Sequence, residues 1–453
     1  TFEALEENRA SSLRLLRAGK SGSLPPEYWE ALLALQRAEI QALRSGKAAD
    51  QAASAAARAR VARLEASFAS RPAVSEGDLL RRAQAALHAD SALFSFHLGG
   101  DISWMWAVDR THIELYALPP RAEIAGLVRN AVGATESDSA ETAAAGAALY
   151  EALFGRLPAR FRNKPNWVVA LDESLFDAPL AALVVRGEAR PAYLVELHAT
   201  QAIPGVGWWL DAAERPAAPA SPLFVGIGDP VYNAADPRLT TRQRASAARP
   251  AIPGQLAAEG FALPRLVASG AEIEACARAW TGDRILLTGT SASPQNLSEQ
   301  LKRNPEVVHF ATHVVESTAR PSDGAIALSL SEGGGAQLLG PGEIADWRIR
   351  ARLVAISGCH SAAGDVLPGT GLLGLTRAWL AAGADSVAGS RWATPDETGA
   401  LFSSLYRNLR ARPGTGPAQA LRAAQLEMLR SGDWRAKPRY WGAYFVIGIE
   451  GVQ

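Results

Sequence analysis

A histidine and a cysteine each end an apolar stretch of this chain, and together they form a nucleophilic pair. The stretch VVHFATH (307–313) ends on His313, and RLVAISGC (352–359) ends on Cys359. Both stretches are short and β-branched or aromatic, which is typical of fully buried strands. Because parallel strands end at the same edge of an α/β sheet, we expect the two side chains to converge there. An imidazole beside a thiol makes the nucleophilic thiolate available near neutral pH.

The order and spacing of the pair favour proteolysis. Cys359 follows His313 by 46 positions (359 minus 313), close to the spacing of about 50 in caspase-type cysteine proteases. The segment SGCHSAAG (357–364) surrounds the thiol with small residues, which leave room for a substrate backbone and offer N–H groups to an oxyanion. A lone cysteine at a strand end is more often an inert core residue, so the prediction depends on the pair.

Other chemistry fits these residues less well. Zinc could be bound by His309, His313, Cys359 and His360. However, His309 and His313 on one strand would lie about 13 Å apart at about 3.3 Å per residue. The segment GTGLLG (369–374) has the spacing of a dinucleotide motif but does not directly follow a strand, so we expect its glycines to serve helix packing.

A substrate pocket is expected at the same sheet edge. The segment RWATPDET (391–398) closes one predicted strand and opens a helix, and its polar residues also suit a helix cap. Acidic residues lining the pocket would favour a basic P1 residue in the substrate. The pocket candidates are Asp323, Asp365, Arg391, Trp392 and Asp396.

Strands alternate with helices through the second half of the chain, which predicts a mostly parallel sheet flanked by helices. The expected strands are 222–232, 285–289, 307–313, 352–358, 386–392 and 440–448. The expected helices are 270–280, where Cys276 is a core residue, and 293–302, 369–382, 396–410 and 416–430.

The first half begins with an Ala-, Arg- and Leu-rich stretch at 1–70, which predicts two or three long helices. A hairpin over 92–118, a helix over 119–133, a strand, turn and helix over 166–184 and a strand over 193–203 follow. PAAPASP (216–222) is the best linker candidate.

Composition narrows the class of protein. The chain has 453 residues, enough for two to four domains. Lys plus Arg equals Asp plus Glu at 46 each, so no overall charge attracts nucleic acid or an anionic membrane. Two cysteines in this length fit a reducing, cytoplasmic compartment. No apolar run is long enough for a transmembrane helix. The chain starts at Thr1, so we expect a fragment or a processed product.

The motifs taken together resemble the CHAT family, caspase-like proteases related to separase and associated with tetratricopeptide repeats. The resemblance rests on VVHFATH, LVAISGCHSAAG, the segment 369–398 and YWGAYFVIG, with FVGIGDPVYN (224–233) and LPRLVASGAEIEA (263–275) upstream. It covers roughly residues 75–453 and implies a caspase-like α/β fold, with an N-terminal half that is a degenerate, pseudo-protease companion.

The resemblance also implies domains and roles. The domains would be a helical segment at 1–74 from a sensor, repeat or linker region, the degenerate half at 75–215 and the catalytic domain at 216–453. His313 would be the dyad imidazole and Cys359 the nucleophile, with oxyanion donors at the backbone of Cys359 and Val314. It implies no metal or organic cofactor, a specific protein substrate and an activating partner or sensor.

Two departures from the family pattern affect the expected activity. Val314 stands where the family commonly has Gly after the histidine, and a β-branched residue resists positive φ. The nucleophile loop is lengthened by His360-Ser361-Ala362-Ala363-Gly364. The alternative to a cysteine endopeptidase is therefore a catalytically silent scaffold on the same fold that transmits a binding signal.

Overall fold

Strands that are buried on both faces form the centre of the C-terminal part of the chain. In the computed structural model, β10 (Pro305–Ala311) and β14 (Leu353–Ile356) are buried at every position. Strands of this kind need continuous apolar runs rather than alternation, which is the pattern found in the sequence. The structure describes residues 2–9, 47–68, 78–187, 191–214, 221–233, 235–239, 263–315, 324–331, 336–357, 370–392, 394, 399–412 and 414–449, with isolated residues between 13 and 38.

The chain divides into two compact units. Unit 1 comprises residues 1–216 and 414–453, and unit 2 comprises residues 217–413. The family resemblance places 414–453 in the catalytic domain at 216–453. A compact unit is defined by packing rather than by activity, so the three-domain division stays a prediction.

Unit 2 is built on a parallel sheet with the strand order β9–β8–β10–β14–β15. The remaining strands are β8 (Ser221–Pro230), β9 (Asp283–Gly289) and β15 (Ser386–Ser390). The chain places β9 on one side of β8 and the later strands of this sheet, β10, β14 and β15, on the other, so the winding reverses between β8 and β10. In open α/β sheets such a switch point leaves a crevice at the carboxyl ends of the strands, where sites form.

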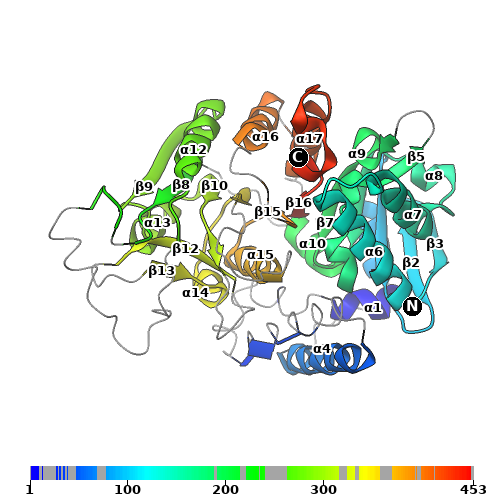
Figure 1. Ribbon diagram of the computed structural model, residues 1–453. Coiled ribbons are helices and arrows are strands. Elements are labelled where there is room, and N and C mark those ends of the chain that lie inside the picture. The colour runs from blue at the N-terminus through cyan, green and yellow to red at the C-terminus, as the bar shows by residue number, and fades with distance from the viewer. Residues whose placement is uncertain are drawn as a thin grey trace. The chain divides into compact units, whose positions relative to one another are not determined.

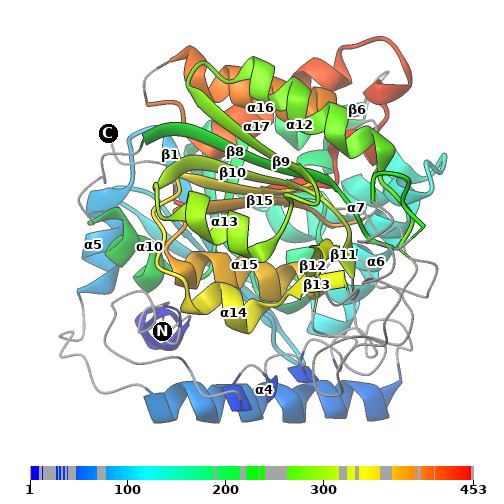
Figure 2. The same ribbon diagram turned by 90° about the vertical axis from the view of Figure 1, so that its left-hand side faces the viewer.

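Helices cover both faces of this sheet, as Figure 2 shows. One face carries α12 (Val267–Ala279) and α16 (Gly399–Ala411). The other carries α13 (Pro294–Leu301), α14 (Pro341–Asp346) and α15 (Thr370–Ala382). The start of α13 follows from its sequence, because Ser293 Oγ accepts the N–H of Asn296 and Pro294 occupies the first turn.

A small antiparallel sheet follows β10 within unit 2. Its strands are β11 (Val314–Val315), β12 (Ala325–Leu330) and β13 (Ala336–Leu339), in that order. Val315, Ala325 and Ala327 pack with Tyr232 and Leu263 in a separate apolar cluster. This cluster positions the chain immediately after β10.

The sheet strands of unit 1 run in the order β3–β2–β1–β4–β7–β16, and Figure 1 labels β2, β3, β7 and β16 among them. An antiparallel meander of β1 (Ser91–His97), β2 (Ser103–Val108) and β3 (Ile113–Leu118) joins the parallel strands β4 (Asn166–Ala170), β7 (Ala199–Ile203) and β16 (Tyr444–Gly448). A further hairpin pairs β5 (Val184–Gly187) with β6 (Pro191–Tyr193).

The helices of unit 1 include the long α4 (Ala48–Phe68), as the leading segment predicted. The others are α1 (Phe2–Asn8), α5 (Leu79–Ala86), α6 (Arg121–Glu136), α7 (Thr142–Phe154), α8 (Ala159–Arg162), α9 (Leu194–Leu197), α10 (Val206–Ala213), α17 (Pro417–Leu429) and α18 (Pro438–Trp441). Within the described residues, no helix has the length and hydrophobicity that crossing a membrane requires.

Three local predictions in unit 1 were wrong. The expected strand over 193–203 starts with the helical turn α9, because the Glu196 carboxylate accepts the N–H of Tyr193 and stabilises a turn. The strand over 440–448 starts only at Tyr444, since Pro438 begins α18. The helix expected within 166–184 is a pair of short 3-10 turns at Glu173–Asp177 and Leu180–Ala182.

Candidate active site

His313 lies two residues beyond β10, at the switch point of the unit 2 sheet. Its imidazole is fully buried and packs on the ring of Tyr232, with ring centroids 4.8 Å apart. The backbone N–H of His313 donates to the Tyr232 hydroxyl over 3.2 Å. Tyr232 therefore fixes His313 in two ways, through the hydrogen bond to its backbone and through packing against one face of its ring.

The Pro264 carbonyl sets the tautomer of this histidine. His313 Nε2 lies 2.7 Å from the Pro264 oxygen. A carbonyl oxygen only accepts hydrogen bonds, so Nε2 carries the proton and Nδ1 of the neutral ring carries the lone pair. Burial lowers the pKa of His313, and the hydrogen bond to Pro264 partly opposes that effect. The lowered pKa favours the neutral imidazole, which is the form that a general base requires.

The register of the sheet relates His313 to the predicted nucleophile. Phe310 of β10 pairs with Ile356 of β14, and the Ser357 N–H donates to the Phe310 carbonyl over 2.8 Å. In the sequence, His313 follows Phe310 by three positions and Cys359 follows Ile356 by three positions. Cys359 itself lies outside the described residues, as do Asp323, Asp365 and Asp396.

The remaining pocket candidates follow β15, the next strand along. Arg391 and Trp392 are buried, with 5% and 2% of their surfaces exposed. Since β10, β14 and β15 are parallel neighbours, these residues and His313 lie toward the same edge of the sheet. Their role in a pocket stays a prediction.

Val314 is part of β11 and keeps a negative φ. The described non-glycine residues with positive φ are Asp138, Glu173, Asp229 and Asn304. Val314 faces Ile326 of β12, and the Ala327 N–H donates to the His313 carbonyl over 2.8 Å. This bond marks Val314 and Ile326 as a non-hydrogen-bonded pair. The Val314 N–H is therefore directed away from β12, toward the edge of that sheet.

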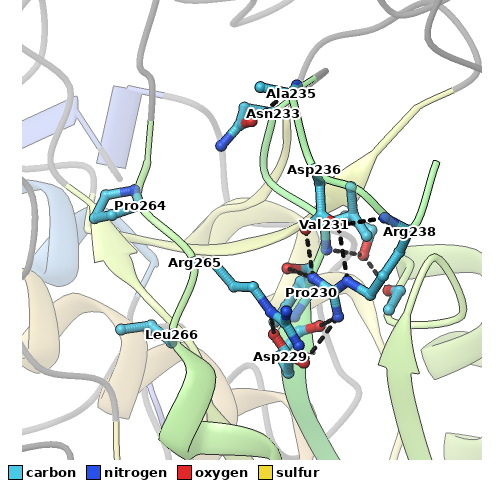
Figure 3. Close-up of polar contacts among 12 residues, drawn as sticks. Asp229, Pro230, Val231, Asn233, Ala235, Asp236, Arg238, Pro264, Arg265 and Leu266 are labelled. Atoms are coloured by element: carbon cyan, nitrogen blue, oxygen red, sulfur yellow. Dashed lines mark hydrogen bonds and ion pairs between the residues drawn. The ribbon is translucent and has the colours of Figure 1, made fainter.

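A four-residue charge cluster, which was not predicted from the sequence, includes Arg265, the neighbour in the chain of Pro264 (Figure 3). Asp229, at the end of β8, pairs with Arg265 through Nε–Oδ1 at 2.8 Å and Nη2–Oδ2 at 2.7 Å. Arg238 reaches Asp229 Oδ2 at 2.8 Å and Asp236 Oδ2 at 2.6 Å. These ion pairs hold the Arg238 and Arg265 pKa values above their usual range and lower that of Asp236. The available signal in the sequence was Gly-Asp-Pro, a turn-forming run with a charged residue at the end of a predicted strand.

A second buried polar group lies inside the unit. His309 Nδ1 is 2.5 Å from the Tyr406 hydroxyl, and its Nε2 is 3.3 Å from Glu272 Oε1. Glu272 also accepts the Ser357 hydroxyl at 2.5 Å. His309 is thus a core residue of unit 2. Within the residues the structure describes, no three His, Cys, Asp or Glu side chains gather as metal ligands would.

Comparison with known proteins assigns the chain to a family. The CHAT domain model matches residues 143–449, well over half of the chain. The chain belongs to the CHAT family. This assignment confirms the resemblance found in the sequence, and the observed fold is the mostly parallel, helix-flanked α/β type that was expected.

This CHAT chain is similar to further proteins at low identity. It is 26% identical over 320 residues to Tetratricopeptide repeat protein 28 of Mus musculus, across 62% of this chain and 12% of the mouse protein. The Saccharomyces cerevisiae separase–securin complex matches 87% of this chain and 31% of the separase chain, at 10% identity and a TM-score of 0.42. The Arg-specific cysteine proteinase gingipain R matches 72% of this chain and 74% of its own, at 8% identity and a TM-score of 0.40.

Proposed function

We propose that this CHAT protein is a cysteine endopeptidase in which His313 is the general base and Cys359 is the nucleophile. The observation that carries the proposal is the buried His313 at the end of β10, whose Nε2 is held by the Pro264 carbonyl so that Nδ1 is left to accept a proton. Support also comes from the pairing of β10 with β14, the strand that precedes Cys359 in the sequence.

The proposed reaction has two halves. His313 Nδ1 accepts the thiol proton, and the Cys359 thiolate attacks the scissile carbonyl carbon. The protonated imidazole then gives its proton to the leaving amine. Water, deprotonated by the same nitrogen, hydrolyses the thioester and restores the thiol.

The negative oxygen of each tetrahedral intermediate needs hydrogen-bond donors. We assign this role to the backbone N–H groups of Val314 and Cys359. The direction of the Val314 N–H, away from its ladder partner, supports its half of the assignment. Val314 stands where the family commonly has Gly, but this difference does not by itself favour a catalytically silent scaffold.

Control by a partner is a further part of the proposal. The similar mouse protein is named for tetratricopeptide repeats. We propose that a sensor or partner protein activates cleavage of a specific protein substrate. The identity of that substrate is left to experiment.

Cleavage profiling tests the proposal. The protein and its Cys359→Ala and His313→Gln variants are incubated with a proteome-derived peptide library, and new peptide ends are read by mass spectrometry. Cuts that require both residues, with a common P1 preference, support the peptidase. Cuts that persist in Cys359→Ala would refute the dyad. A protein that binds a partner equally well with and without Cys359, and never cleaves, is the scaffold.

A further inference from the structure

Asp229 ties together the loop that touches His313, through both its side chain and its backbone. The side chain is 12% exposed and makes the two-point contact to Arg265. The backbone N–H of Asp229 donates to Ser269 Oγ over 2.8 Å, and that hydroxyl donates onward to the Leu266 carbonyl over 2.7 Å. Two independent tethers thus run from one residue of β8 to the segment 265–269.

The held segment includes the peptide group that contacts the imidazole. The Pro264 carbonyl belongs to the planar peptide unit that also contains the Arg265 nitrogen. Fixing the Arg265 side chain and the Leu266 carbonyl therefore restricts the direction of the Pro264 oxygen. That oxygen is 2.7 Å from His313 Nε2.

The described charges of the cluster are paired with one another, which favours a structural role for Asp229 over direct contact with a substrate. Oδ1 accepts Arg265 Nε, and Oδ2 accepts Arg265 Nη2 and Arg238 Nη1. Arg238 is in turn held by Asp236 and by the Asp229 and Pro230 carbonyls. Two carboxylates thus balance two guanidinium groups. Asp229 therefore does not fit the role of an acidic residue that binds a basic side chain of the substrate.

Asp229 also has an unusual backbone, with φ of 45° between Gly228 and Pro230. Non-glycine residues in this region store strain that the surroundings must offset, and they gather at functional sites. Its ion pairs and the Ser269 contact supply that offset. This strained residue lies near the end of β8, beside the switch point of the sheet. The candidate site is found at the same place.

We propose that Asp229 is a positioning residue, which holds the Pro264 carbonyl on His313 Nε2 through Arg265 and Ser269 and so maintains the imidazole in its base-competent tautomer. This rests on the proposed function for its catalytic meaning, but the imidazole itself can be observed without any cleavage.

The test is ¹⁵N NMR of the imidazoles in the Cys359→Ala protein, with His313 assigned by His313→Gln. The parent should show a protonated Nε2 and an unprotonated Nδ1. In Asp229→Asn we expect a mixture of tautomers and a lower His313 pKa, because the carbonyl hydrogen bond raises that pKa. Glu274→Gln is the matched control: it breaks an exposed α12 ion pair with Arg278 and should change neither readout.

In the active protein, Asp229→Asn should lower kcat about ten- to a hundred-fold with little change in KM. Arg265→Lys keeps the charge and should lie between the parent and Arg265→Met. Should Asp229→Asn not fold, Ser269→Ala and Arg265→Met carry the test.

An unchanged His313 tautomer and pKa in folded Asp229→Asn or Arg265→Met would overturn the positioning role. If the spectra respond as expected but no variant, parent included, cleaves any peptide, the proposed function fails while the positioning role stands. If cleavage requires Cys359 but neither kcat nor the spectra change in Asp229→Asn, the positioning role fails while the proposed function stands.

Discussion

The Glu272–Ser357 hydrogen bond joins α12 to the end of the strand that leads to the nucleophile, and its removal gives the most direct stability prediction. Both side chains are buried, with 5% and 6% of their surfaces exposed. Ser357 Oγ donates to Glu272 Oε1 over 2.5 Å. Cys359 follows Ser357 by two residues, so this bond anchors the base of the predicted nucleophile loop.

The size of the effect follows from burial and charge. A hydrogen bond to a charged group contributes about 1.5–3 kcal/mol. Glu272→Ala removes this bond together with the contact to His309 Nε2, so we expect unit 2 to lose about 3 kcal/mol. Ser357→Ala removes the donor alone and should cost about 1–2 kcal/mol. Because the two changes remove one shared bond, the double variant should be more stable than the sum predicts by about 1.5 kcal/mol or more.

The assay is urea unfolding of the four chains. A chain with two compact units can unfold in more than one step. The coupling energy is therefore taken from the unfolding transition whose urea midpoint changes in Glu272→Ala. Glu274→Gln, on the exposed face of the same helix, is the control and should leave that transition in place. A coupling energy below about 0.5 kcal/mol, the additivity expected of independent sites, would refute the reasoning.

Two further predictions test other parts of the account. Val314→Pro removes a backbone N–H that the β11–β12 ladder does not use, so we expect kcat to fall about a hundred-fold or more with stability retained; equal activity of Val314→Pro and Val314→Ala would exclude this donor. In unit 1, burial lowers the pKa of His198 to about 4. As the pH falls, the unfolded chain, whose histidine pKa is about 6.5, binds a proton before the folded chain does. The contribution of His198 to stability is therefore complete above pH 6.5, and the free energy of unfolding should fall by up to about 3 kcal/mol toward pH 4. Urea midpoints across pH should show this slope, and His198→Gln should flatten it.

The sequence predicted the strands of the site well because parallel strands buried on both faces leave a strong local signal. The ends of β10 and β14 were placed within about two residues, and with them the position of His313. The start of α13 was also readable, since a serine cap and a proline in the first turn are local features.

The positioning groups could not be predicted, because they depend on topology rather than on neighbours in the chain. Asp229, Arg238 and Arg265 meet only once β8 and the segment before α12 fold to the same sheet edge. The Pro264 carbonyl has no side-chain signature at all, and its role follows from a 2.7 Å contact across 49 positions. The α9 turn is a second example. The Glu196 carboxylate accepts the N–H of Tyr193 and stabilises a helical turn, although the surrounding residues have the composition of a strand.

The measurement that tests the central claim most directly is the rate of Cys359 alkylation by iodoacetamide against pH. The chain has two cysteines, and burial raises the pKa of Cys276 well above the ordinary thiol range, so Cys276 should stay unlabelled in the folded protein. A dyad predicts that Cys359 reacts at pH values well below the ordinary thiol pKa of about 8.5, and that His313→Gln moves the midpoint up to that range. A midpoint near 8.5 that is identical in the parent and in His313→Gln would contradict the dyad.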